Sequence, residues 1–235
     1  MKKGEKRMKK TIFAALAASF VFGIGLAAFG ARADIVPWTV PARRTLFVSA
    51  WNTRIRLQAP QNMCFVDKTM AAQNQDWINM KDFAEQNNDQ VLLAGFMDCG
   101  QIDGVASWGE KTPDYGIVTW LDPAIGATTK MSREDYLDMR EASFRNYAQT
   151  RFPGLKAENV HRTADAVAVI LTGNLMKPGD DPGVKHQAAA IIATTTLRHV
   201  PVEFTLYYGG KNVPDKEALA NIADTFARQM ILLNH

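Results

Sequence analysis

The chain has few of the residues that build reactive sites. Only two of its 235 residues are cysteine, Cys64 and Cys99, and only four are histidine. The cysteines are 35 positions apart, so they form neither a CxxC redox motif nor half of a zinc ribbon. The histidines are scattered, and no two of them have metal-ligand spacing on one element. We therefore expect no metal site and no cofactor.

Basic residues are also scarce once the first 33 residues are set aside. That segment has a lysine-rich start, an apolar run over 12–29, and a small-x-small cleavage pattern over 31–33. We interpret 1–33 as a cleavable signal peptide, with an uncleaved membrane anchor as the alternative. The segment holds seven of the 27 basic and one of the 24 acidic residues, which leaves 20 basic and 23 acidic residues. No basic run follows it, and this excludes a nucleic-acid partner.

The leader also predicts where the protein works. Its plain lysine-rich form is typical of bacterial export, so we expect a periplasmic or secreted protein that does not contact the membrane after cleavage. Such compartments are oxidising, and cysteines in them tend to form disulfides. Residues 34–45 contain two prolines and predict an extended N-terminal arm. The remaining residues, 46–235, have the length and apolar content of a single domain.

Hydrophobic periodicity predicts alternating strands and helices along this domain. The predicted strands are 53–59, 63–66, 91–97, 115–121, 164–175, 185–198 and 202–208, and the predicted helices are 69–87, a second that begins after Ser132 and ends before 152, and 216–233. In the second helix Ser132 is the expected N-cap. The residues expected to face the core are Tyr136, Met139, Ser143 or Ala142, and Tyr147, with Phe144 as a further candidate. Short links join the last three strands, which requires antiparallel pairing. The fold class is therefore α+β, a mostly antiparallel central sheet flanked by helices in an α/β/α sandwich.

The closing part of the chain carries a resemblance to a known fold group. It runs "ADAVAVILTGNL … HQAAAIIATTTLRHVPVEFTLYY" and then "DKEALANIADTFARQMILL". In this order of elements the chain resembles the PsbP-like α/β/α sandwich family over roughly residues 46–233. The resemblance implies a binding or assembly factor, because members of that group mostly lack a shared catalytic set. It carries no functional residue over to this chain.

Two familiar catalytic patterns are present only in part. The segment Val105-Ala106-Ser107-Trp108-Gly109 resembles a nucleophile elbow but has valine where the tight turn requires glycine. Gly209-Gly210-Lys211-Asn212 lies between a strand and a helix, but it lacks the upstream glycine and the Ser or Thr of a phosphate loop. Neither segment predicts a catalytic residue.

Cys64 and Cys99 are predicted to form a structural disulfide. Each lies near the end of a strand-like run, and a helix joins the two runs, so the strands can be neighbours. Buried free thiols and a catalytic thiol are the alternatives. A catalytic thiol would need a histidine partner, and none is near in sequence.

The loop after Cys99 is the predicted binding surface, because it combines acids with aromatic residues. Its candidate residues are Asp98, Asp103, Trp108, Glu110, Tyr115 and Trp120. For the three aromatic residues, core packing is the alternative and the favoured interpretation. The favoured interpretation is an exported, non-catalytic protein that binds an envelope protein or a small ligand. The alternative is an exported hydrolase that uses the region with Asp98, Cys99, Asp103 and Glu110, together with a distant histidine such as His186.

Overall fold

The computed structural model describes residues 44–86, 90–102, 113–121, 131–175, 185–210 and 213–235. The predicted signal peptide and most of the predicted arm lie outside these residues. The elements are β1 (Thr45–Ala50), β2 (Thr53–Gln58), β3 (Met63–Phe65), α2 (Ala71–Glu85), β4 (Gln90–Asp98), α3 (Cys99–Ile102), β5 (Tyr115–Leu121), α4 (Arg133–Arg151), β6 (Lys156–Arg162), β7 (Val167–Leu175), β8 (His186–Leu197), β9 (Val200–Gly209) and α5 (Lys216–Leu232). None of the described helices is both long and apolar enough to cross a membrane.

The centre of the fold is a seven-stranded sheet in the order β3-β4-β5-β9-β8-β7-β6. Every neighbouring pair in it is antiparallel. Strands β1 and β2 form a separate antiparallel hairpin. The predicted α+β class with an antiparallel sheet is therefore confirmed.

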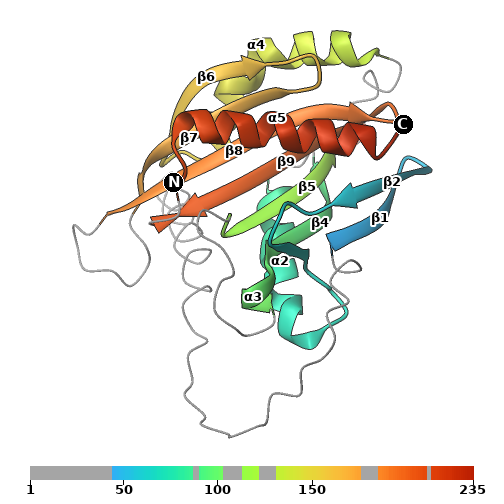
Figure 1. Ribbon diagram of the computed structural model, residues 1–235, viewed down its shortest axis with the longest axis vertical. Coiled ribbons are helices and arrows are strands. Elements are labelled where there is room, and N and C mark those ends of the chain that lie inside the picture. Colours follow the sequence, from blue (N-terminus) through green and yellow to red (C-terminus); the bar gives the residue numbers. More distant parts are fainter. Residues whose placement is uncertain (1–43, 87–89, 103–112, 122–130, 176–184, 211–212) are drawn as a thin grey trace, which may run out of the picture.

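Helices cover both faces of the sheet, as Figure 1 shows for α5 in front and α2 behind. Alternate residues of β8 separate the two layers, because successive side chains of a strand point to opposite faces. Ile191 packs in the core under α5, which also contains Ile55 and Leu57 of the β1–β2 hairpin. Ile192 packs in the core under α4. Helix α2 closes a third cluster over β4 and β5 on the α4 face.

Local sequence explains where the long helices begin and which face they bury. The Ser132 hydroxyl accepts a hydrogen bond from the Asp135 N–H at the start of α4, and Asp215 caps α5 through the Ala218 N–H. The buried face of α4 was predicted only in part. Tyr136 and Phe144 are buried, but Met139, Ala142 and Ser143 are exposed, and Leu137 lies in the core although it was not predicted there. The buried stripe of α4 is wide and includes Tyr136, Leu137, Phe144 and Ala148.

Two strands were not predicted from the sequence. Strand β1 begins at Thr45, so the last residue of the predicted arm already belongs to the folded domain. Strand β6, KAENVHR, lies at the edge of the large sheet and pairs only with β7. An edge strand of this kind is mostly polar, so it lacks the apolar run that marked the central strands.

Candidate binding groove beside the disulfide

Cys64 and Cys99 are bonded to each other, as predicted. Cys64 is the middle residue of β3, and Cys99 follows the last residue of β4 directly. The two strands are antiparallel neighbours, and the Cα atoms of the two cysteines are 4.9 Å apart, within the range of native disulfides. Both sulfur atoms are therefore used in a cross-link between two adjacent strands.

The disulfide braces the short loop 60–62 that precedes β3. The Cys99 N–H donates to the Asn62 carbonyl at 2.9 Å, and the Met63 N–H donates to the Pro60 carbonyl at 3.1 Å. Asn62 has a φ of 66°, a left-handed conformation that asparagine tolerates better than most residues. The loop is consequently held at both ends, by its own turn and by the start of α3.

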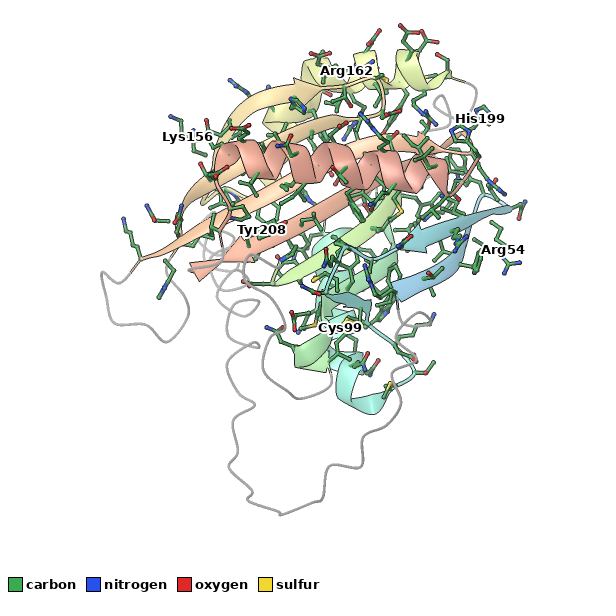
Figure 2. The ribbon with its side chains drawn as sticks, viewed as in Figure 1. Arg54, Cys99, Lys156, Arg162, His199 and Tyr208 are labelled. Atoms are coloured by element: carbon green, nitrogen blue, oxygen red, sulfur yellow. A yellow bond between two sulfur atoms is a disulfide. The ribbon has the colours of Figure 1, made fainter. Side chains whose placement is uncertain are left out.

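This braced loop forms one wall of a groove of about 560 Å³. Helix α5 forms the other wall, and Pro113 also lines the groove. The floor contains Tyr208 of β9 and Phe226 of α5, both almost fully buried. Figure 2 shows Tyr208 on the strand beside α5, with Cys99 farther toward the β3–β4 edge. A volume of this size is within the range of small-ligand pockets.

The α5 wall is a regular stripe of uncharged polar side chains. Asn221, Thr225 and Gln229 are four positions apart, so they lie one above another on the same side of the helix. All three are exposed. None of the ten described residues that line the groove is charged, and the loop wall adds the amides of Gln61 and Asn62. The groove thus offers amide and hydroxyl donors and acceptors around an apolar floor.

The chemistry of the groove favours binding over reaction. Burial raises the pKa of the Tyr208 hydroxyl above its ordinary value, so this group stays protonated across the physiological range. Amide groups do not titrate at all, and a threonine hydroxyl needs an adjacent base to become a nucleophile. Such groups can orient a neutral ligand by hydrogen bonds, and the apolar floor can cover its less polar face.

Sequence reasoning missed this groove, although one local signal was present. The apolar stripe of α5 was recognised, but the neighbouring uncharged stripe at positions 221, 225 and 229 was not. Exposed helix faces usually carry charged residues, so three uncharged polar residues at i, i+4 and i+8 are an informative deviation. The other wall, 60–62, is more than 150 positions away in sequence, and only the fold brings it there.

The predicted binding surface after Cys99 is only partly described by the structure. Asp98 is buried, and its Oδ1 accepts hydrogen bonds from the Gly100 N–H at 2.8 Å and the Gln101 N–H at 3.2 Å. It thereby caps the short helix α3. Asp103, Trp108 and Glu110 lie outside the described residues, as do Ser107 and Lys211 of the two partial motifs.

Tyr115 and Trp120 do not share a surface. Both belong to β5, but they are five positions apart, and an odd separation places two side chains on opposite faces of a strand. Tyr115 stacks on Tyr207 with ring centroids 5.1 Å apart, on the face that α2 and α4 cover. Trp120 packs edge-on against Trp51 at 5.5 Å, on the face of α5 and the hairpin. Both aromatic rings therefore contribute to packing.

The described residues exclude the thiol form of the hydrolase alternative and a direct contact between Asp98 and His186. The Cys99 sulfur is bonded to Cys64 and cannot act as a thiol nucleophile. His186 begins β8, whereas Asp98 ends β4, and β5 and β9 lie between these strands. Three strand intervals amount to about 14 Å, which exceeds the reach of a direct hydrogen bond between the two side chains.

A second polar cluster lies under α4, on the opposite face of the sheet from the groove. Glu203 of β9 is 1% exposed and accepts hydrogen bonds from Gln90 Nε2 at 2.9 Å and from the Tyr147 hydroxyl at 2.7 Å. Arg140 Nη2 lies 3.4 Å from the other carboxylate oxygen. Burial, and then the Glu203 carboxylate, raise the pKa of Tyr147 above its ordinary value.

This cluster ties α4 to the sheet. The Arg140 guanidinium stacks over the Tyr147 ring at 4.8 Å, which further fixes both side chains. Nearby, the Tyr136 hydroxyl and the Thr194 hydroxyl are hydrogen-bonded at 2.7 Å. The sequence signal for the cluster was Glu203, the lone acidic residue of a mostly apolar central strand. A carboxylate that is buried there needs hydrogen-bond or ion-pair partners.

Comparisons with protein-family models, with curated proteins and with solved structures found no match to this chain. The resemblance to the PsbP-like family therefore stays a prediction from the order of elements, and the functional argument depends on the geometry of the chain itself.

Proposed function

We propose that this chain is an exported, non-catalytic binding protein whose ligand site is the groove between α5 and the loop 60–62. The observation that carries the proposal is the disulfide between Cys64 and Cys99. Instead of providing a thiol, they form the cross-link that braces one wall of the groove. A groove wall that is covalently supported is pre-organised, and pre-organisation lowers the entropic cost of binding.

The lining residues support a particular class of ligand. Amide side chains line both walls, and the floor is aromatic and apolar. A charged ligand would be desolvated in this groove without an opposite charge among the described lining residues to compensate, which is unfavourable. We therefore infer a neutral ligand rich in hydroxyl or amide groups, such as an oligosaccharide or an uncharged peptide segment.

Two observations support export. The first 33 residues have the pattern of a bacterial signal peptide, and the disulfide requires an oxidising environment to persist. A periplasmic or secreted location satisfies both. The PsbP-like order of elements is consistent with the same type of role, an accessory binding or assembly factor of the envelope.

The test is to block the groove without disturbing the core. Thr225→Arg places a long charged side chain at the centre of the exposed α5 wall, and Leu232→Arg is the matched control on the same helix outside the groove. Binding is measured by amide chemical-shift changes on titration with neutral oligosaccharides and uncharged peptides. We expect saturable shifts at the groove residues, lost in Thr225→Arg and retained in Leu232→Arg.

Two outcomes contradict the proposal. If ligand-induced shifts cluster on a surface away from α5 and the loop 60–62, the groove is not the site. If Thr225→Arg and Leu232→Arg bind equally well, the uncharged lining has no role in recognition.

A further inference from the structure

A second pocket, of about 500 Å³, lies at the C-terminal end of α5 and differs in chemistry from the groove. Its lining includes Arg133 at the start of α4, Arg198 and His199 in the turn between β8 and β9, and His235. No described Asp or Glu side chain is among its eight lining residues. The pocket is thus rich in hydrogen-bond donors, and two of its side chains are guanidinium groups.

The two arginines have donors to spare. Arg198 donates Nε to the Asn234 carbonyl at 3.1 Å and Nη1 to the Arg54 carbonyl at 3.3 Å, and both acceptors are uncharged. Within the described residues Arg198 forms no ion pair, so its charge is not neutralised. Because a guanidinium has five N–H donors, three of those on Arg198 remain for a ligand.

Arg133 belongs to a small network of ion pairs. Its Nη2 donates to the Thr196 carbonyl at 3.4 Å, and its Nη1 lies 3.8 Å from Asp165, beyond hydrogen-bond distance. Asp165 is shared with Arg228, whose Nε lies 3.6 Å from it, and Arg228 also pairs with Asp224 at 3.1 Å. These four side chains together carry no net charge, so Arg133 offers the pocket mainly N–H donors, whereas Arg198 offers an uncompensated charge as well. The buried Nε of Arg133 has no hydrogen-bond partner in the part of the chain that the structure describes.

The backbone of the turn gives an independent reason to look for a function. Leu197 pairs with Val200, so Arg198 and His199 are the two central residues of a tight hairpin, with φ values of 49° and 66°. Both are left-handed, and this type of turn strongly favours Asn-Gly. A basic residue at each position is less stable than that pair, and such strain is often retained at functional sites.

The two observations agree on an anionic ligand group. Figure 2 shows His199 at the same end of the molecule as Arg54, where the hairpin, the turn and the C-terminus meet. Donors come from α4 on one side and from the β8–β9 turn on the other. A tetrahedral anion accepts hydrogen bonds in all directions and can be held from both sides, whereas a planar carboxylate is best matched by one guanidinium.

We propose that this pocket binds a phosphate group. The site is distinct from the groove and does not depend on the function proposed for it. Arg133 and Arg198 provide charge-assisted hydrogen bonds from opposite sides, and His199 contributes a further donor from the turn. The phosphate can belong to a small molecule or to a phospholipid headgroup, since the recognised chemistry is the same.

The test uses inorganic phosphate as the probe, titrated calorimetrically into the full chain at low ionic strength. We expect one saturable site. Arg133→Gln removes the charge from one side and should weaken binding about tenfold or more, equivalent to about 1.4 kcal/mol. The control is Arg162→Gln, because Arg162 lies on β6, pairs with Asp138 and Glu141 of α4, and does not line the pocket.

His199→Gly separates a structural role from a binding role. Glycine adopts the left-handed conformation without steric cost, so this variant should unfold at a higher temperature than the wild type. The same variant removes the imidazole and should bind phosphate more weakly. It also keeps the test decisive if Arg133→Gln fails to fold.

Vesicles distinguish the two sources of phosphate. Capture by phosphatidylcholine vesicles that contain phosphatidylglycerol, weakened by His199→Gly, assigns the pocket to a lipid headgroup. Phosphate binding without vesicle capture assigns it to a small phosphorylated molecule. The proposal is overturned if folded wild-type protein shows no saturable phosphate binding, even where vesicles capture it, or if Arg162→Gln weakens binding as much as Arg133→Gln does.

Discussion

Reduction of the Cys64–Cys99 disulfide should destabilise the fold by an amount that its loop length sets. The bond closes a loop of 35 residues, and the cross-link removes conformations mainly from the unfolded chain. In the chain-entropy relation this loop corresponds to about 3.8 kcal/mol at 25 °C. The native state should survive reduction, because the β3–β4 ladder and the hydrogen bond from Cys99 to Asn62 do not depend on the sulfur atoms.

The measurement compares urea unfolding of the same protein before and after complete reduction. With an m-value of about 2 kcal/mol/M, the midpoint should fall by about 2 M. The m-value should rise slightly, because the reduced unfolded chain is more expanded. Amide hydrogen exchange should accelerate in the loop 60–62 and in β3, and it should stay unchanged in the central strand β8. Mass spectrometry before and after treatment verifies that the bond was present and then broken.

Two results would refute this reasoning. A midpoint that is unchanged after verified reduction would show that the unfolded chain is already restricted, so loop closure contributes nothing. Uniform acceleration of exchange across the whole sheet would show that the bond supports global packing instead of one wall of the groove. In that case the observation that carries the proposed function would lose its basis.

Two further predictions concern the polar groups under α4. Glu203→Gln leaves Arg140 partly buried without its charged partner and should lower the free energy of unfolding by about 2–3 kcal/mol. The control Asp138→Asn breaks an exposed ion pair and should change the free energy of unfolding by less than about 1 kcal/mol. Equal losses of the two variants in chemical denaturation would contradict this prediction. Burial raises the pKa of Tyr136 to about 12, so the unfolded chain ionises first, near pH 10, and stability should fall between pH 10 and 12 by up to about 2.7 kcal/mol from this residue. Unfolding curves across this range should be less steep in pH for Tyr136→Phe, and an identical pH dependence would argue against the burial of this hydroxyl.

Much of the fold could be predicted because the central strands are apolar on both faces. The runs that became β4, β7, β8 and β9 are buried under helices on each side, so they read as continuous apolar segments. The polar edge strand β6 gives no such signal, and it was missed. The cysteine pairing was predictable because both cysteines lie at ends of runs joined by one helix, which limits how far apart they can be.

The sites were less predictable, for a reason that is geometric. Tyr115 and Trp120 looked like parts of one surface because they are close in sequence, but strand alternation sends them to opposite layers. The groove and the phosphate pocket each combine segments more than 60 positions apart. A local sequence pattern describes only one wall of such a site. The polar stripe of α5 is visible in the sequence, but the segment that faces it is not.

Helix α5 borders both proposed sites, and the way its end is fixed decides whether they communicate. Asn234 lies just beyond α5, and its side-chain amide hydrogen-bonds both the N–H and the carbonyl of Arg56, each at 2.9 Å, much as a strand neighbour would. The same side chain also donates to the Met230 carbonyl, and Arg198 donates to the Asn234 backbone. To shift α5 along its axis would break the bonds to Arg56 and the bond from Arg198 together. We infer that the groove and the proposed phosphate pocket bind their ligands independently. A ligand in one site could affect the other by moving α5, but that movement would break the hydrogen bonds that fix the end of the helix.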